Sequence, residues 1–157
     1  LQENLKTALC ALNLLTNSQK NLLFALNSLK SLDLRGRCEQ FTKNIIIDVG
    51  HNEMAAEVLA QHFKGRKFTL IYNSFLDKNI FAILRILQPL IDKILIYEYF
   101  SERKLATKEI STIAKELGIA CENFKCMQKE KDYLVFGSFV LVENFLKEYF
   151  EKIQTND

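Results

Sequence analysis

The stretch Ile45-Ile46-Ile47-Asp48-Val49-Gly50-His51-Asn52 decides the fold class of this chain. The three isoleucines predict a buried strand, and the residues after Asn52 have the spacing of an amphipathic helix. A strand that ends in Asp48 and turns through Gly50 into a helix is typical of open α/β sheets, which bind ligands at the carboxyl ends of their strands. We therefore look for function first in residues 48–52.

Strand and helix signals alternate from Arg37 onward. Apolar runs predict strands over Cys38–Phe41, Ile45–Asp48, Phe68–Tyr72, Ile94–Tyr97 and Tyr133–Phe136, with a weaker one near Ile119–Phe124. Helices are predicted over Glu53–Phe63, Asn79–Gln88, Lys108–Leu117 and Phe139–Phe150. Several strands are near-continuous apolar runs, which indicates burial on both faces and a parallel sheet. The predicted fold is α/β, a Rossmann-like, mostly parallel sheet with helices on both faces.

A two-helix segment is expected before this sheet. Leucines at helical spacing predict one helix within Leu5–Leu15 and another within Leu22–Leu29, with Ser18 as the N-cap of the second. The stretch Leu32–Gly36 breaks the pattern, so we place a boundary between residues 1–34 and residues 35–157. The chain starts at Leu1 within a helical pattern, and we expect it to be part of a longer protein.

Composition is that of an ordinary soluble globular protein: 157 residues, 48% hydrophobic, 25% charged and a net charge of +2. So small a charge argues against nucleic acid or a membrane as partner, and the apolar runs are far below membrane-spanning length. No secretory signal opens the chain, so a cytoplasmic location is expected. The cysteines show no C-x-x-C spacing and are expected to be buried free thiols: Cys10, Cys38, Cys121 and Cys126.

Polar side chains follow each main strand. They are Asp48, His51 and Asn52; Asn73, Ser74, Asp77 and Lys78; Glu98, Ser101, Glu102 and Arg103; and Gly137-Ser138. With Arg37 at the domain entrance, this mixture suits a phosphorylated or carboxylate ligand. The sequence holds no phosphate-binding loop, no dinucleotide-binding glycine motif and no G-x-S-x-G elbow. His51 and His62 give no zinc pattern, so no metal site is predicted within the chain.

Most of these residues also have a purely structural interpretation. A helix cap explains Asn52 and Ser138, and hydrogen bonds from the N–H groups of a turn explain Asp48. An ion pair with Glu39 would occupy Arg37.

The two histidines are interpreted differently. His51 lies in a loop between two strong elements, which favours a functional role. His62 lies among the apolar positions Leu59 and Phe63 and is interpreted as structural.

In combination, and in this order, the features resemble the C-terminal domain of the folylpolyglutamate synthase/dihydrofolate synthase family, within the Mur ligase superfamily. The matching residues are Gln2, Asn4, Ala8, Gly36-Arg37, Asp48-Val49-Gly50-His51-Asn52 (the family's D-x-A-H-N-P), Asp77-Lys78, Arg103 and Gly137-Ser138. The chain departs from the pattern at Gly50 in place of Ala, at Glu53 in place of Pro and at Asn79, where a second acid is common. Glycine is expected at most to loosen the turn.

The resemblance implies ATP-dependent amide ligation, in which ATP phosphorylates a substrate γ-carboxylate and the amine of glutamate attacks the acyl phosphate. It implies that residues 1–34 are the last helices of a central ATP-binding domain and that residues 35–157 are the glutamate ligase domain. ATP and Mg²⁺ would be held mainly by the central domain, outside this chain. The implied partners are glutamate, folate or dihydropteroate, and that central domain.

The resemblance also implies a role for each site residue. In binding the nucleotide, Asn4 would contact adenine, Arg37 the base and phosphates, and Asp48 the ribose. Catalysis would involve His51 and Ser138, which would place glutamate and the reacting phosphate. A possible substrate loop contains Asp77, Lys78 and Arg103. Two alternatives stay open, a peptidoglycan Mur ligase domain and a non-catalytic α/β interaction domain. The Asp77-Lys78 and Gly137-Ser138 pairs favour the folate branch.

Overall fold

A computed structural model describes residues 2–28, 35–128 and 130–154 of the chain. The chain divides into two compact units, residues 1–34 and residues 35–157, which are described separately. The first unit contains helices α1 (Gln2–Thr16) and α2 (Gln19–Ser28). The Ser18 hydroxyl accepts a hydrogen bond from the Asn21 amide at 3.3 Å, so Ser18 caps α2 as predicted. The predicted helix residue Leu29 lies outside the described residues.

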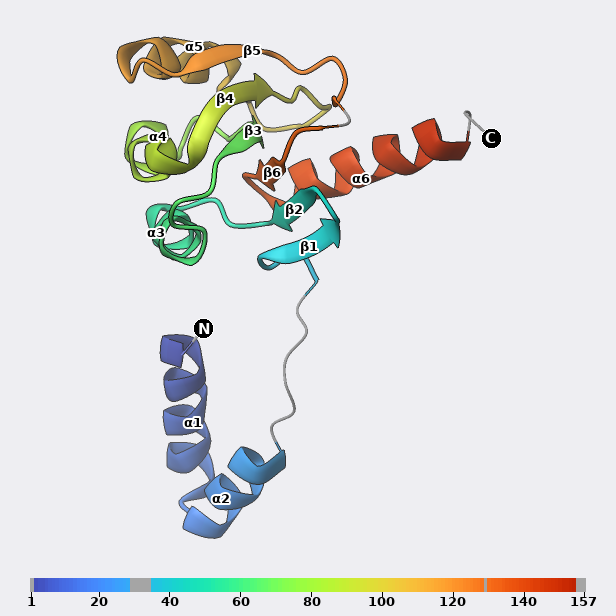
Figure 1. The fold of residues 1–157 in the computed structure, drawn as a ribbon. Coiled ribbons are helices and arrows are strands. Elements are labelled where there is room, and N and C mark those ends of the chain that lie inside the picture. Colours follow the sequence, from blue (N-terminus) through green and yellow to red (C-terminus); the bar gives the residue numbers. More distant parts are fainter. Residues whose placement is uncertain (1, 29–34, 129, 155–157) are drawn as a thin grey trace. The chain divides into compact units, whose positions relative to one another are not determined.

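In the described part of residues 35–157, six strands form one sheet in the order β1-β2-β6-β3-β4-β5 (Figure 1). The strands are β1 (Glu39–Thr42), β2 (Ile45–Asp48), β3 (Phe68–Tyr72), β4 (Ile91–Ile96), β5 (Ala120–Asn123) and β6 (Tyr133–Phe136). Only β1 pairs antiparallel to its neighbour within this described sheet. The predicted α/β class and the mostly parallel sheet are therefore confirmed.

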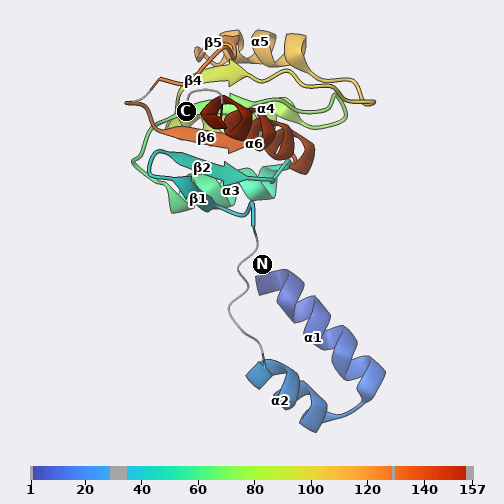
Figure 2. The ribbon, with the colours of Figure 1, turned by 90° about the vertical axis from the view of Figure 1, so that its right-hand side faces the viewer.

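The four helices described after Arg35 cover both faces of this sheet. They are α3 (Glu53–His62), α4 (Ile80–Leu87), α5 (Thr107–Glu116) and α6 (Phe139–Gln154), with the short 3₁₀ turn η1 (Gln88–Leu90) after α4. Helices α3, α4 and α5 lie on one face and α6 lies on the other (Figures 1 and 2). Two hydrophobic clusters fill the layers between helices and sheet.

The central strands are buried on both faces, as their continuous apolar runs predict. Every residue of β2, β3 and β6 is buried. In β3, Leu70 packs on the side of α3–α5 and Ile71 packs on the side of α6, because successive side chains of a strand point to opposite faces. If a central strand slipped by one residue, the side chains that face α3–α5 and those that face α6 would exchange sides, which fixes the register.

The two edge strands differ from the predicted pattern. A two-residue turn at Lys43-Asn44 joins β1 to β2, and so short a connection permits only antiparallel pairing. At the other edge, β5 is mostly exposed, which explains why its apolar signal is weak. Strand β4 begins at Ile91 and not at Ile94, because the exposed Asp92 interrupts the apolar run without ending the strand.

The expected burial of the cysteines is wrong. All four are free, but Cys10 and Cys126 are exposed, and Cys38 and Cys121 are half-buried. Cys121 lies on the edge strand β5 and Cys38 lies in the turn before β1, at a φ of 50°. Both side chains are therefore only partly covered by the rest of the domain. No described helix is long and apolar enough to cross a membrane.

Asn52 is the N-cap of α3: its side-chain oxygen accepts a hydrogen bond from the Ala55 amide at 2.9 Å. We expect Asn52→Ala to lower the free energy of unfolding by about 1 kcal/mol, because a helix N–H loses its acceptor. Urea titration measures this. Asn123→Ala, on the exposed edge strand, is the control and should cost less than about 0.5 kcal/mol. Equal losses in the two variants would contradict the capping role.

Candidate functional site

The predicted site residues follow strands that end side by side. Parallel pairing places Asp48 of β2 opposite Phe136 of β6, Phe136 opposite Tyr72 of β3, and Tyr72 opposite Ile96 of β4. The loops after these four strands therefore leave from one edge of the sheet. This is the edge at which open α/β sheets bind ligands.

Asp48 joins the turn before β1 to the loop after β2. Its Oδ1 accepts a hydrogen bond from the Gly50 amide at 2.6 Å, and its Oδ2 accepts one from the Cys38 amide at 2.8 Å. The Val49 amide donates to the Gly36 carbonyl oxygen at 2.8 Å. Asp48 is only 7% exposed. Asp48 therefore accepts hydrogen bonds from turn N–H groups, as its structural interpretation requires. Because these bonds hold Gly36 and Cys38, they also hold Arg37 beside the loop after β2.

Arg37 does not form the ion pair considered from sequence. Arg35 takes Glu39 instead, with 2.8 Å between Nε and Oε1. The exposed Arg37 guanidinium lies 5.9 Å above the ring centroid of Phe139, the first residue of α6. Arg37 has no carboxylate partner among the described residues, so its charge is available to an anion at this edge.

Ser138 caps α6, as its structural interpretation requires. Its Oγ accepts a hydrogen bond from the Leu141 amide at 3.0 Å and lies 3.5 Å from the Tyr99 hydroxyl oxygen. Ser138 is 7% exposed. Its hydroxyl therefore lies at the start of a helix, where the dipole and the unpaired N–H groups favour a negative ligand.

His51 is half-buried and has few contacts. Its Nδ1 lies 3.4 Å from the Val49 carbonyl oxygen, which leaves most of the hydrogen-bonding capacity of the ring unused. His62, in contrast, is exposed at the end of α3 and packs edge-on against Phe63, with 4.6 Å between ring centroids. The structure thus places only the first histidine beside Asp48.

Gly50 does not loosen its turn, contrary to expectation. A Cβ at this position would lie 2.5 Å from Ala55 Cβ, 2.7 Å from Asp48 Oδ1 and 2.8 Å from the Phe136 ring. The space that an alanine would need is filled by the first turn of α3 and by β6. Glycine here tightens the packing of the loop.

Asp77, Lys78 and Arg103 form one cluster, although two loops supply them. Arg103 Nη2 lies 2.5 Å from Asp77 Oδ1, and Lys78 Nζ lies 3.4 Å from Asp77 Oδ2. Desolvation of Asp77 opposes its ionisation, but Lys78 and Arg103 together outweigh this and lower the pKa of the Asp77 carboxyl. The guanidinium also lies 4.0 Å above the Phe75 ring centroid. The predicted substrate loop is therefore an ion-pair cluster at the surface, in which two cations share the single carboxylate of Asp77.

Asn73 has a structural role that sequence reasoning did not assign. It is fully buried, and its Nδ2 donates to the Tyr97 carbonyl oxygen at 3.0 Å and to Thr107 Oγ1 at 3.3 Å. Its Oδ1 accepts from the Ser74 amide at 2.8 Å. Asn73 thereby ties the loop after β3 to the end of β4 and to the start of α5. A lone amide at the end of an apolar strand was the available signal.

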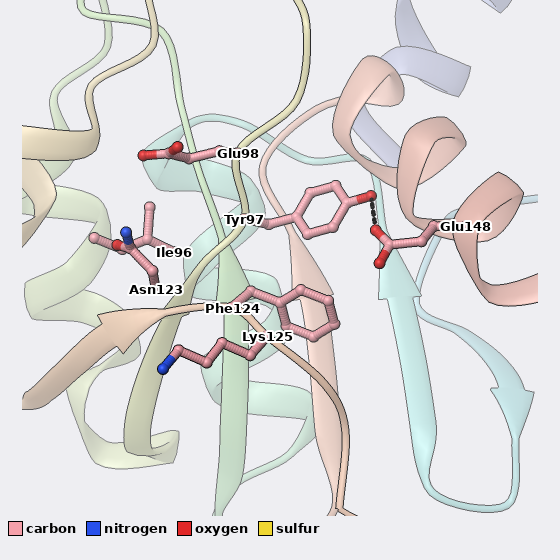
Figure 3. Close-up of a pocket in the computed structure, with 7 residues that line it drawn as sticks. All are labelled: Ile96, Tyr97, Glu98, Asn123, Phe124, Lys125 and Glu148. Atoms are coloured by element: carbon pink, nitrogen blue, oxygen red, sulfur yellow. Dashed lines mark hydrogen bonds between the residues drawn. The ribbon is translucent and has the colours of Figure 1, made fainter. Parts of the chain in front are cut away.

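A pocket of about 280 Å³ lies beside this edge, at the ends of β4 and β5 (Figure 3). The Tyr97 hydroxyl donates to Glu148 Oε2 at 2.7 Å within it. A second pocket of about 370 Å³ includes Lys67 and Asp92, which precede β3 and begin β4. Of the polar residues predicted at the strand ends, only Glu98 lines one of these two pockets. Asp48, His51 and Ser138 line neither of them.

One predicted site residue, Asn4, belongs to the first unit, where it is exposed on α1. Among the described residues no three metal-ligating side chains are grouped, so the edge offers carboxylate, imidazole, hydroxyl and guanidinium groups without a metal cluster.

Together, these features define a doubly wound α/β domain with polar side chains gathered at the carboxyl ends of its parallel strands. Among solved structures, the chain is similar to a Helicobacter pylori folylpolyglutamate synthetase, at 39% identity over 96% of this chain and 40% of that one, with a TM-score of 0.85. It is also similar to a Thermotoga maritima folylpolyglutamate synthase, at 27% identity over 83% of this chain and 34% of that one, with a TM-score of 0.60. No protein-family model and no curated protein matches the chain.

A third structure shares the fold at 22% identity over 78% of this chain and 33% of that one, with a TM-score of 0.62. It is a bifunctional folylpolyglutamate synthase/dihydrofolate synthase with Mn, AMPPNP and L-glutamate bound. The chain spans 33–40% of the lengths of these three proteins. The chain belongs with the folylpolyglutamate synthase/dihydrofolate synthase family and is consistent with the C-terminal domain of such an enzyme.

Proposed function

We propose that this chain is the C-terminal part of an ATP-dependent ligase that adds glutamate to folate or dihydropteroate through an acyl phosphate. Residues 35–157 would be the glutamate ligase domain, and residues 1–34 the last helices of the ATP-binding domain. The single observation that carries this proposal is the similarity at 39% identity to the Helicobacter pylori enzyme, which extends over 96% of the chain.

The residues of the strand-end edge suit the nucleotide half of this role. Arg37 has no carboxylate partner in the described chain and would approach the base and phosphates of ATP. Both oxygens of Asp48 retain a lone pair beyond their bonds to Cys38 and Gly50, with which they would accept hydrogen bonds from ribose hydroxyls. Asn4 would contact adenine from the first unit.

His51 and Ser138 would place the incoming glutamate and the reacting phosphate. Both side chains can donate a hydrogen bond to an anionic oxygen, and Ser138, whose Oγ accepts from the Leu141 amide, would do so at a helix start. Lys78 and Arg103 carry charges that a glutamate carboxylate could share with Asp77. In this account the residues orient ligands and stabilise developing charge, and none acts as a nucleophile.

ATP and Mg²⁺ would be bound mainly by a central domain outside this chain. A structure of the same fold that holds Mn, AMPPNP and L-glutamate supports the use of a nucleotide and a divalent metal ion by such a protein. Neither of the two pockets described above is lined by Arg37 or Asp48, which agrees with a nucleotide site that another domain completes. The proposed location of the enzyme is the cytoplasm.

The full-length protein that contains this chain provides the test. We expect it to release ADP and to incorporate labelled glutamate when ATP, Mg²⁺ and a reduced folate or dihydropteroate are supplied. Peptidoglycan precursors with the matching amino acids are the control substrates, and we expect no product from them. Activity only with those precursors, or none with folates, would contradict the proposal.

A further inference from the structure

Tyr99 is the closest side-chain neighbour of Ser138 that the proposed roles leave unused. Its hydroxyl oxygen lies 3.5 Å from Ser138 Oγ, at the outer limit of a hydrogen bond. Contacts of this kind are often long without ligand and shorten when the ligand binds. Tyr99 comes from the loop after β4 and Ser138 from the loop after β6, so the contact joins two loops of the edge.

The hydrogen-bonding capacity of Ser138 determines what the contact does. A serine hydroxyl has one proton to donate and two lone pairs that accept. The Leu141 amide fills one lone pair. Either hydroxyl could donate in this contact, but a phenol is a stronger acid than an aliphatic alcohol, which favours Tyr99 as the donor to the second lone pair of Ser138.

We propose that Tyr99 is a positioning residue that holds Ser138 as a pure hydrogen-bond donor to an anionic ligand oxygen. With both lone pairs occupied by Leu141 and Tyr99, the Ser138 proton can only point away, toward a ligand. The oxygen it meets belongs to a phosphate or to a carboxylate, the two anionic groups of the proposed reaction. This inference rests on the proposed function.

The surroundings keep Tyr99 protonated and in place. Burial raises the pKa of Tyr99, so its hydroxyl stays a donor at neutral pH. Its ring stacks on that of Tyr97, with 6.2 Å between centroids and 29° between planes. The Tyr97 hydroxyl is in turn bonded to Glu148 of α6, the helix that Ser138 caps (Figure 3). Both partners of the contact are therefore attached to one helix.

Glu148 accepts a hydrogen bond from Tyr97 and forms an ion pair with Lys152. Partial burial opposes the charge of Glu148, but hydrogen bonds from Lys152 and Tyr97 outweigh this and lower the pKa of its carboxyl. The Glu148 carboxylate stays charged at neutral pH and keeps Tyr97 anchored on α6. The stacked rings of Tyr97 and Tyr99 are thus anchored to α6 through Glu148.

A double-mutant cycle in the full-length protein tests the inference. Ser138→Ala should lower kcat/KM about 100-fold, and Tyr99→Phe should lower it roughly three- to ten-fold, as for one hydrogen bond. If Tyr99 acts through Ser138, adding Tyr99→Phe to Ser138→Ala should change nothing further. A higher KM for glutamate in Tyr99→Phe identifies a carboxylate as the ligand, whereas a lower kcat at constant KM identifies the phosphoryl group.

Two control variants separate positioning from stability. Tyr149→Phe removes another half-buried hydroxyl from the α6 face and should leave kcat/KM unchanged. Ser138→Asp keeps an acceptor for the α6 cap but cannot donate, so it should be as slow as Ser138→Ala while it melts at the wild-type temperature.

The outcomes distinguish the inference from the function beneath it. Additive losses in the double mutant, or full activity of Tyr99→Phe beside a slow Ser138→Ala, would overturn the role of Tyr99 and leave the ligase intact. Full activity of Ser138→Ala would overturn the inference together with the role of Ser138. A wild-type protein without ligase activity would overturn the proposed function itself.

Discussion

Replacing His51 by alanine should lower kcat/KM of the full-length ligase at least about 100-fold while leaving the fold intact, as for loss of one hydrogen-bond donor to developing charge. The imidazole stands beside Asp48 at the strand-end edge, where its Nδ1 lies 3.4 Å from the Val49 carbonyl oxygen. Little structure depends on the ring, so the loss of activity should come from lost ligand contacts. Steady-state kinetics with varied glutamate and ATP measures it.

The second histidine is the control for this result. His62 is exposed at the end of α3, and His62→Ala should keep wild-type kcat/KM. Both variants should unfold within about 0.5 kcal/mol of the wild type in urea. A wild-type rate for His51→Ala, or an equal loss for His62→Ala, would reject the assigned role.

Replacing Gly137 by alanine should destabilise the domain by at least about 3 kcal/mol, from backbone strain and overpacking together. Gly137 has a φ of 145°, which L residues rarely adopt, and an added Cβ would overlap the Asn73 carbonyl oxygen well within 3.0 Å. Asn73 cannot retreat, because its side chain is bonded to Tyr97 and Thr107. Urea denaturation of the chain measures the change.

Gly118 gives the matched control. It also has a positive φ, 68°, but an added Cβ would meet nothing within 4 Å. Gly118→Ala should therefore cost only the backbone term, roughly 1–2 kcal/mol. If both variants lost the same stability, the close approach between the loops after β3 and β6 would have no energetic weight.

The central part of the fold follows from local sequence signals. Strands β2, β3 and β6 span the predicted residues because continuous apolar runs can be satisfied only by burial on both faces. The edges follow less well. The polar strand β5 is held by its pairing with β4. Such tertiary support does not require the alternation of apolar and polar residues that identifies a strand in a sequence.

The site could be predicted as a set of residues but not as a set of contacts. Strand ends indicate which polar groups share an edge, and the register of β2, β6, β3 and β4 agrees with this. Sequence could not show that Asp48 would bind two backbone amides, or that Arg35 would take Glu39 from Arg37. Side-chain geometry within a few ångströms decides which arginine pairs with Glu39. From sequence alone, two arginines close to the same glutamate are equally good candidates.

Tyr97 and Tyr99 were missed for a related reason. In sequence they continue the apolar pattern of β4 and give no separate signal. Only the return of α6 over the same face places Glu148 and Ser138 within reach of their hydroxyls. A polar contact between distant segments depends on topology, which local periodicity does not encode.

The central claim is that the strand-end edge is one half of a ligase site whose other half binds ATP in a neighbouring domain. The most direct measurement compares glutamate incorporation with ATP and folate by three proteins. These are the full-length protein, the present chain alone, and the full-length protein from which residues 35–157 have been removed. We expect product only from the full-length protein. ATP-dependent addition of glutamate by the present chain alone, or by the protein that lacks residues 35–157, would contradict the account.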